Sequence, residues 1–390
     1  MKERVGAVVI GGDFQGLGVI RSLSEEGIPV FLVEHEWSIS RYSRYTKGRV
    51  INNYLLSNDL FSKYMIDLAI ENNLTGWVLY PNNDELVKLV SINKDKLAAH
   101  YRIPVPPWET VKKFYIKREA NDIAEKISIP IPKKYKGDNL DEILSQDLVF
   151  PIVLKPSFKE DYFPKTRKKA IRVNDRDSLI KEYKNMAGIV DPSYIVVQEF
   201  IGGGPKNLYS YVAFFDGEKV VAGMSAIRRR QHPMDFGQAT TFAYSVCVPE
   251  LENMATKLLK EIGHYGLAEV EFMKDDKDGV FKFLEINGRQ WGWHTLAKGA
   301  GINLPFYLFQ HMTGEKLGDI PVPITGVKWI RLITDIPTVY KELVSGRMSF
   351  AEYLDSFKGK KEFAVLSFKD PLPFIMEFLM IPYLWWKRGF

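Results

Sequence analysis

Two short stretches govern the interpretation of this sequence: Glu269-Val-Glu-Phe272 and Phe283-Leu-Glu-Ile-Asn-Gly-Arg289. Each alternates acidic or amide side chains with apolar ones, which predicts two half-buried strands. The acidic segment 274–279 between them ends in glycine and predicts a turn, so that the two strands form a hairpin. Both glutamates of the first stretch then share one face of their strand, as do the glutamate and the asparagine of the second.

The acidic side chains of this hairpin predict a site for a divalent cation. Carboxylates at equivalent heights on neighbouring strands repel one another unless a cation lies between them. Mg²⁺ prefers oxygen ligands and keeps substrate phosphates in its coordination shell. A solvated, charged hairpin is the alternative interpretation. Asn287 and Arg289, which closely follow Glu285, favour a site over it.

Length and composition indicate a folded protein of several domains. The chain has 390 residues, of which 46% are apolar and 26% charged, with 53 Lys and Arg against 48 Asp and Glu. These ordinary values exclude a disordered, collagenous or disulfide-stapled chain. The length predicts two or three domains with sizeable cores.

Other function classes are disfavoured by charge, cysteine and the N-terminal segment. The apolar run Val5–Ile10 is too short for the core of a signal peptide, which favours a cytoplasmic protein. A net charge of +5 is too modest to predict binding to nucleic acid. The lone Cys247 and the scattered histidines predict neither a disulfide nor a zinc site.

The first part of the chain predicts a doubly wound parallel sheet. Val5–Ile10 is a strand, residues 11–18 form a glycine-rich turn, Val19–Glu26 is a helix and Pro29–Val33 is a second strand. The glycines of the turn do not fit the G-x-G-x-x-G spacing of dinucleotide-binding proteins. A tight connection from strand to helix therefore explains them better than a nicotinamide site does.

The remainder of the chain predicts an α+β region. Asp84 is expected to cap a helix over 85–92, and the proline-rich segment 103–107 ends the first unit. Beyond it, strands over 150–155 and 195–200 enclose a helix, and later strands alternate in polarity as antiparallel strands do.

The hairpin and three further segments resemble the ATP-grasp superfamily. The two hairpin stretches are similar to its metal-binding signature, in which an acid precedes E-x-N-x-R by about a dozen residues. Ile152-Val-Leu-Lys-Pro156 is similar to the strand that carries a phosphate-binding lysine, and Val197-Gln-Glu-Phe-Ile-Gly-Gly203 to the hinge that holds adenine. Lys117, ahead of Ile129-Pro-Ile-Pro132, resembles the first nucleotide lysine. The resemblance covers residues 1–315.

This resemblance implies an architecture. We expect an α/β N-terminal doubly wound parallel-sheet (pre-ATP-grasp) domain, an α+β ATP-grasp domain of two subdomains, and a C-terminal helical extension. The expected bounds are 1–106 for the first domain, 107–195 for the small subdomain, 196–320 for the large subdomain with the metal site, and 321–390 for the extension.

The resemblance also implies a set of site residues for ATP and Mg²⁺ (or Mn²⁺). Those expected to bind the nucleotide are Lys117, Lys155, Lys169, Gln198, Glu199, Phe200, Ile201 and Asn207. Those expected to hold the metal are Glu271, Glu285 and Asn287. Those expected to act on the transferring phosphoryl group or the substrate are Lys155, Arg228 and Arg289, because cationic side chains stabilise the charge of phosphoryl transfer and arginine forks match carboxylates.

Three details depart from the superfamily pattern or lie beside it. The phosphate-covering loop is usually rich in glycine, but residues 157–170 contain none, so Lys165, Lys168 or Lys169 is expected to replace backbone amides there. Asn207 stands where an acidic ribose partner is usual. The tryptophans in Trp291-Gly-Trp-His294 are expected to pack at the start of a helix.

The function implied is that of an ATP-dependent carboxylate-amine ligase. An acyl phosphate forms from ATP and a small-molecule carboxylate, a small-molecule amine captures it, and ADP and phosphate are released. The D-aspartate ligases and the synthetase domains of carbamoyl phosphate synthases share the layout most closely. A carboxyphosphate-forming enzyme, a non-catalytic nucleotide-binding scaffold and a dinucleotide enzyme are the alternatives.

The tail over 371–390 is strongly apolar. Between Phe374 and Trp386 the only charged residue is Glu377, and Pro382 interrupts the run. A bilayer span needs about 20 apolar residues, so this run is too short to cross one. We expect it to pack on the body of the protein or to join two copies as a homodimer, and rank peripheral membrane contact second.

Overall fold

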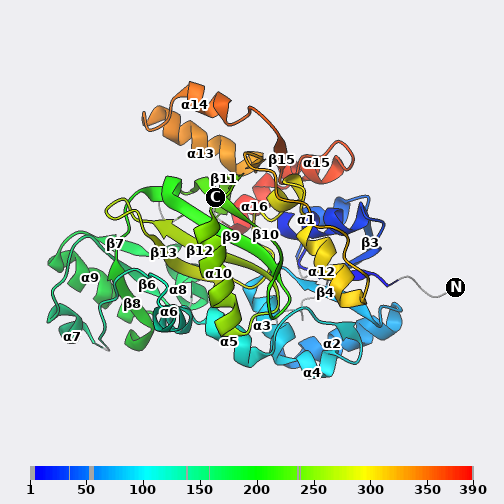
Figure 1. The fold of residues 1–390 in the computed structure, drawn as a ribbon, viewed down its shortest axis with the longest axis horizontal. Coiled ribbons are helices and arrows are strands. Elements are labelled where there is room, and N and C mark those ends of the chain that lie inside the picture. The colour runs from blue at the N-terminus through cyan, green and yellow to red at the C-terminus, as the bar shows by residue number, and fades with distance from the viewer. Residues whose placement is uncertain are drawn as a thin grey trace.

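The computed structural model describes residues 5–34, 36–51, 57–137, 139–157, 159–234, 237 and 239–388. Within these residues the chain forms a five-stranded, a three-stranded and a seven-stranded sheet. Figure 1 shows the five-stranded sheet towards the N-terminus on the right, the three-stranded sheet at the left end and the large sheet between them.

The N-terminal domain is the doubly wound parallel sheet that the sequence predicts. Its strand order is β3-β2-β1-β4-β5, and every neighbouring pair is parallel. All residues of β1 and β2 are buried, because helices cover both faces of the sheet, and this burial explains their continuous apolar sequences. The elements are β1 (Ala7–Ile10), α1 (Phe14–Ser24), β2 (Val30–Glu34), η1 (Ile39–Tyr42), β3 (Thr46–Ile51), α2 (Asn58–Glu71), β4 (Trp77–Pro81), α3 (Asp84–Ile92), α4 (Lys94–Leu97) and β5 (Tyr101–Arg102).

The glycines between β1 and α1 serve a tight connection, as predicted. Gly11 has a φ of +96°, a conformation that side chains with a Cβ rarely adopt. A Cβ at Gly16 would lie 2.2 Å from the carbonyl oxygen of Gly11, so the helix can approach the turn only without one. Asp13 caps α1 by accepting a hydrogen bond from the backbone N–H of Phe14.

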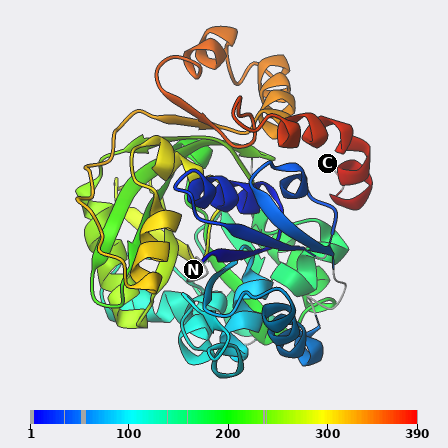
Figure 2. The same cartoon turned by 90° about the vertical axis from the view of Figure 1, so that its right-hand side faces the viewer.

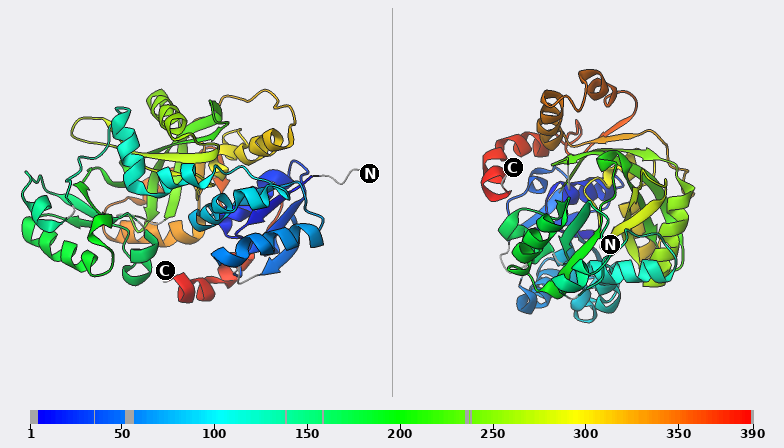
Figure 3. Two further views of the ribbon diagram at one scale, coloured as in Figure 1. Left: turned by 90° about the horizontal axis from the view of Figure 1, so that it is seen from below. Right: turned by 90° about the vertical axis from the view of Figure 1, so that its left-hand side faces the viewer.

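The three-stranded sheet forms the small subdomain. Its order is β7-β6-β8, and both pairs are antiparallel. It has a core of its own and lies at the far left of the left-hand view in Figure 3. The elements from residue 108 onward are α5 (Trp108–Tyr115), α6 (Lys117–Lys126), α7 (Leu140–Leu144), β6 (Ile152–Pro156), α8 (Lys159–Thr166), β7 (Ile171–Val173), α9 (Arg176–Ala187), η3 (Pro192–Tyr194) and β8 (Ile195–Glu199).

The subdomain bounds differ from those expected at both ends. Strand β8 pairs with β6 along its whole length, so the small subdomain continues to Glu199 and does not end at residue 195. Helices α5 and α6 bury Val111, Phe114, Ala120 and Ala124 in the core shared by the N-terminal domain and the large sheet. They therefore belong with that core, because their apolar faces point there and not to the small sheet.

The large sheet carries the predicted hairpin and has the order β13-β12-β9-β10-β11-β14-β15. Its last two strands come from the C-terminal extension, which is thus not purely helical. The remaining elements are η4 (Gly204–Asn207), β9 (Leu208–Phe215), β10 (Val220–His232), β11 (Ala239–Val246), α10 (Pro249–Ile262), β12 (Gly266–Lys274), β13 (Phe281–Asn287), α11 (Thr295–Gly299), α12 (Leu304–Thr313), β14 (Lys328–Ile330), α13 (Leu332–Val344), α14 (Phe350–Asp355), β15 (Lys361–Phe363), α15 (Leu372–Leu379) and α16 (Ile381–Arg388).

The apolar tail packs on the body through one face. Met380 is buried in the core that the N-terminal domain shares with the large sheet, and Phe374 and Tyr383 pack partly against it. Figure 2 shows α15 and α16 beside the N-terminal domain. Among the described residues no helix is long and apolar enough to cross a membrane.

A buried ion pair fastens this tail to the N-terminal domain. The Arg21 guanidinium donates to the Asp370 carboxylate at 3.0 Å and to two backbone carbonyl oxygens at 2.8 Å, those of Val365 and Asp370 itself. Asp370 also accepts hydrogen bonds from the Ser43 hydroxyl at 2.8 Å and the Arg44 backbone N–H at 3.0 Å. Arg21 is 8% and Asp370 1% exposed, so neither charge has water as an alternative partner.

We expect Asp370→Asn to lower the free energy of unfolding by about 3 kcal/mol, because it leaves the buried Arg21 charge uncompensated. Urea unfolding monitored by tryptophan fluorescence measures the change. Asp355→Asn is the matched control, since Asp355 pairs with Lys358 at 3.0 Å on the surface and should change stability far less. Equal destabilisation by the two substitutions would contradict this account.

Candidate active site

A cavity of about 750 Å³ lies where the three sheets meet. The loop after β1 and the start of α3 line it on one side, β6 and the end of β8 on another, and the β12–β13 hairpin on a third. The C-terminal extension contributes Arg331 and Thr334. Ligands of enzymes commonly bind in such concave sites between domains.

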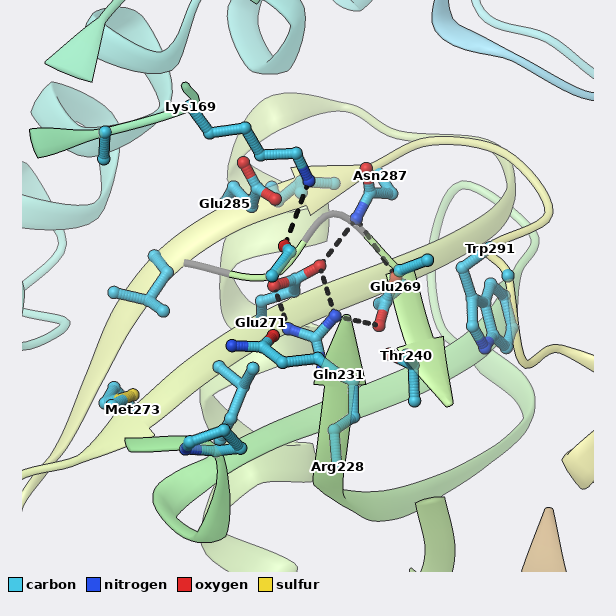
Figure 4. A pocket seen from close by; sticks show the side chains of 18 of the residues that line it. Lys169, Arg228, Gln231, Thr240, Glu269, Glu271, Met273, Glu285, Asn287 and Trp291 are labelled. Atoms are coloured by element: carbon cyan, nitrogen blue, oxygen red, sulfur yellow. Dashed lines mark hydrogen bonds and ion pairs between the residues drawn. The ribbon is translucent and has the colours of Figure 1, made fainter. Parts of the chain in front are cut away.

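The predicted hairpin faces this cavity with its acidic side. In the register of β12 and β13, Glu271 lies opposite Glu285 and Glu269 opposite Asn287. The Asn287 amide donates hydrogen bonds of 3.0 Å to both Glu269 and Glu271 (Figure 4). The hairpin thus gathers the three residues expected to hold a metal, Glu271, Glu285 and Asn287.

Cationic side chains compensate the carboxylates in this structure. Arg228 on β10 donates two hydrogen bonds to Glu271 and lies 3.8 Å from a carboxylate oxygen of Glu269 (Figure 4). Lys117 at the start of α6 pairs with Glu285 at 2.7 Å. Although burial alone would lower the pKa of Arg228, the neighbouring carboxylates, Glu271 foremost, raise it above its usual value.

Glu269 is a buried acid. The sequence pattern predicts that it shares the face of Glu271 on the strand, but it was not among the expected site residues. It is 2% exposed, and the Ser210 hydroxyl donates to it at 2.9 Å. Burial, followed by the charge of Glu271, raises its pKa well above the ordinary value of 4.5. Its side chain orients Asn287 and lies beside Arg228.

Three lysines converge on the same cavity from separate elements. Lys155 extends from β6 and Lys117 from α6, while Lys169 donates to the carbonyl oxygen of Gly237 at 3.2 Å. Burial, reinforced by the charge of Lys117, lowers the pKa of Lys155 from 10.5 to about 7. An anion bound beside Lys155 would raise its pKa again.

The hinge residues Gln198, Glu199, Phe200 and Ile201 also line the cavity. The Glu199 carboxylate accepts hydrogen bonds from Lys282 at 2.7 Å and from the backbone N–H of Lys133 at 2.9 Å. Lys282 was not among the expected residues. Strict alternation would place Lys282, three residues before Glu285, on the opposite face of β13, so the sequence pattern does not indicate it.

Some expected residues lie elsewhere. Asn207 does not line the cavity, because its amide donates to the backbone of Lys274 at 3.0 Å and to Asp276 in the hairpin turn. The expected ribose contact therefore finds no support. Lys165 and Lys168 are exposed and also outside the cavity lining, since part of the expected loop is helix α8.

Arg289 reaches across to the N-terminal domain. It forms a two-pronged ion pair with Asp84 at 2.7 and 3.0 Å and donates to the Asn287 side-chain oxygen at 3.3 Å. The helix cap expected at Asp84 is Asn83, whose side chain accepts from the N–H of Leu86. Asp84 is therefore not the cap of α3, and its carboxylate holds Arg289 over the hairpin.

Known proteins resemble this chain in sequence and in fold. No protein-family model matches the chain. D-aspartate ligase from Enterococcus faecium is 25% identical over 332 residues, which cover 79% of this chain and 77% of that protein. The chain resembles the biotin carboxylase domain of the Hydrogenobacter thermophilus 2-oxoglutarate carboxylase with a TM-score of 0.65 and 18% identity, over 83% of this chain and 73% of that one.

The L-amino acid ligase from Bacillus licheniformis has a TM-score of 0.61 and 15% identity, over 83% of this chain and 78% of that one. These relatives and structural neighbours are ATP-grasp superfamily members, and the chain shares their fold. The segments that carry the sequence resemblance, namely the hairpin, the strand with Lys155 and residues 198–201, line one cavity.

We expect Lys155 to react with amine-modifying reagents at neutral pH. With a pKa of about 7, half of its side chains are neutral at pH 7, roughly 1,000-fold more than for an ordinary lysine. Peptide mass spectrometry after brief acylation at pH 6–9 measures the rate, with exposed Lys358 as the internal control. A rate at Lys155 that rises only near pH 10, as at Lys358, would contradict the environment described above.

Proposed function

We propose that the protein is an ATP-dependent carboxylate-amine ligase that forms an amide through an acyl phosphate and releases ADP and phosphate. The observation that carries this proposal is the single cavity in which the acidic hairpin, the lysines of β6 and α6, and the hinge face one another. The relationship to D-aspartate ligase supports the type of bond formed.

In this proposal ATP lies along the cavity, with its adenine at the hinge and its phosphates at the lysines. The backbone and side chains of residues 198–201 hold the adenine, and Lys117, Lys155 and Lys169 bind the phosphates. Glu271, Glu285 and the side-chain oxygen of Asn287 form a set of oxygen donors that suits Mg²⁺ or Mn²⁺. The excess negative charge of the hairpin, compensated by Arg228 and Lys117, matches the charge that a divalent ion brings. Mg²⁺ would neutralise the phosphate charge during transfer.

The reaction then requires positioning and charge stabilisation from the chain. A carboxylate oxygen of the substrate attacks the γ-phosphorus, the bond to the bridging oxygen breaks and ADP leaves. The amine attacks the acyl carbon, loses a proton, and the C–O bond to phosphate breaks. Arg289, fixed by Asp84, stabilises the transferring phosphoryl group, while Arg228 orients Glu271 through its hydrogen bonds.

We expect ADP release to require Mg-ATP, one carboxylate and one amine, and Glu285→Gln to reduce it by at least about 100-fold through loss of a metal ligand. A coupled assay across an array of acids and amines measures this, with bicarbonate included. Asp278→Asn is the matched control, because Asp278 lies in the exposed turn of the same hairpin outside the cavity.

Each pattern of turnover points to one function. Bicarbonate-dependent ADP release without any amino acid would favour a carboxyphosphate-forming enzyme, a reading consistent with the neighbour solved with bicarbonate. Nucleotide binding without turnover for any pair would favour a non-catalytic scaffold and contradict the ligase proposal.

We further propose that the exposed apolar face of the extension joins two copies of the chain. Tyr340, Val344, Phe368, Leu379 and Trp386 are each more than 60% exposed on α13, α15, α16 and the connecting loop. So much exposed apolar surface on one extension is unusual for a monomer.

We expect sedimentation velocity to show a dimer that Leu379→Glu dissociates, with Asp278→Glu as a control on another face. Flotation of the protein with anionic vesicles tests the alternative. A monomer that floats would overturn the dimer in favour of peripheral membrane contact, and a monomer that does not float would overturn both.

A further inference from the structure

The C-terminal extension contributes to one wall of the cavity. Arg331, between β14 and α13, lines the cavity together with Thr334. The loop after β1 supplies Asp13 and Phe14 to the same wall. None of these residues belongs to the nucleotide or hairpin machinery.

Arg331 is buried but only partly satisfied. It is 5% exposed, its Nη2 group donates to Glu377 at 3.2 Å, and its guanidinium lies 3.8 Å over the Phe14 ring. Among the described residues the Nε group has no acceptor, and Glu377 is the sole acceptor of hydrogen bonds from the guanidinium. An arginine carries five N–H donors, so most of the N–H groups of Arg331 remain available to a ligand.

Other buried arginines near the extension are paired more completely. Arg230 binds both oxygens of Asp335 at 2.8 Å each, and Arg21 makes three hydrogen bonds with Asp370 and Val365. Arg331 has only one oxygen of one carboxylate. The contrast indicates that its remaining donors serve a ligand and not the fold.

The position of Arg331 separates it from the phosphoryl-transfer residues. Its side chain contacts Phe14 and Glu377, whereas Arg289 and the lysines contact the hairpin or face the phosphate region. A carboxylate bound by Arg331 would therefore be kept from the site of phosphorylation. Burial raises the pKa of Glu377, and the charge of nearby Asp13 adds to this shift, so Asp13 lies on the same wall as Arg331 and Glu377.

We propose that Arg331 binds the non-reacting carboxylate of an amino-acid substrate, and that Asp13 receives its ammonium group. The inference rests on the proposed ligase function and narrows its substrate class to zwitterionic amino acids. A guanidinium fork and a carboxylate on one wall are complementary to a carboxylate and an ammonium group on one carbon. The group that reacts, whether a side-chain carboxylate or an amine, is then left unbound by Arg331 and Asp13.

Glu377 acts as a positioning residue for Arg331. It is 2% exposed and lies in the apolar tail, where no other charged residue separates Phe374 from Trp386. Its hydrogen bond and the Phe14 ring hold the guanidinium in one orientation. The tail thus shapes the substrate site even though it lies outside the ATP-grasp domain.

The test compares the most active amino acid in the full-length protein with its α-carboxamide, in steady-state assays with saturating Mg-ATP. Wild type should prefer the free acid by about 100-fold in kcat/KM, the size expected for losing a buried charged contact. Arg331→Gln should raise the KM for the amino acid, leave the KM for ATP unchanged and abolish the preference. Arg331→Lys should restore part of it. Exposed Arg229, outside the cavity lining, provides the control Arg229→Gln, which should match wild type.

The outcomes separate this inference from the proposed function. Turnover whose preference for the free acid survives in Arg331→Gln would overturn the inference and leave the ligase proposal intact. If no pair of substrates is turned over, calorimetry with Mg-ADP present and the same amino acids as probes decides. Binding by wild type that Arg331→Gln loses would support the subsite. Equal binding by both proteins, or none by either, would overturn it.

Discussion

The negative charge gathered on one hairpin is the constraint on which the rest of the structure depends. Strand register places Glu271 opposite Glu285, with the buried acid Glu269 two residues before Glu271 on the same strand, and water cannot screen the carboxylates fully in the cavity. Charges in such surroundings are tolerated only when cations face them. Arg228 on β10 and Lys117 on α6 form ion pairs with these carboxylates, and these ion pairs hold both elements against the hairpin. The carboxylates of the hairpin would therefore already be in position when a phosphate-bound divalent ion binds.

The C-terminal extension is part of the catalytic unit and not an appendage. It adds β14 and β15 to the large sheet and fastens itself through the buried pairs Arg21–Asp370 and Arg230–Asp335. These contacts place Arg331 at the cavity wall, next to the loop after β1. The extension and the N-terminal domain thereby share one wall of the cavity, where Arg331 contacts Phe14, a residue more than 300 positions away in the sequence.

Sequence reasoning identified segments that line the cavity where the pattern is local. The alternation of Glu269 to Asn287, the lysine of β6 and the hinge are each encoded within a few residues, and the period of a strand fixes which side chains share a face. It failed where partners come from distant segments. Nothing near Arg289 in the sequence indicates Asp84, 205 residues away, and nothing near Arg331 indicates Phe14. Asn207 was expected at the nucleotide from the superfamily pattern, whereas in the structure its amide donates to Lys274 and Asp276 at the hairpin turn.

The most direct test of the central claim is Mn²⁺ binding measured by electron paramagnetic resonance, because it requires no knowledge of the substrates. If the hairpin holds the metal on the nucleotide phosphates, wild type will bind one Mn²⁺ tightly only when ADP is present, and Glu271→Gln and Glu285→Gln will each lose that binding while Asp278→Asn retains it. Unchanged Mn²⁺ and ADP binding in the two hairpin variants would contradict the account.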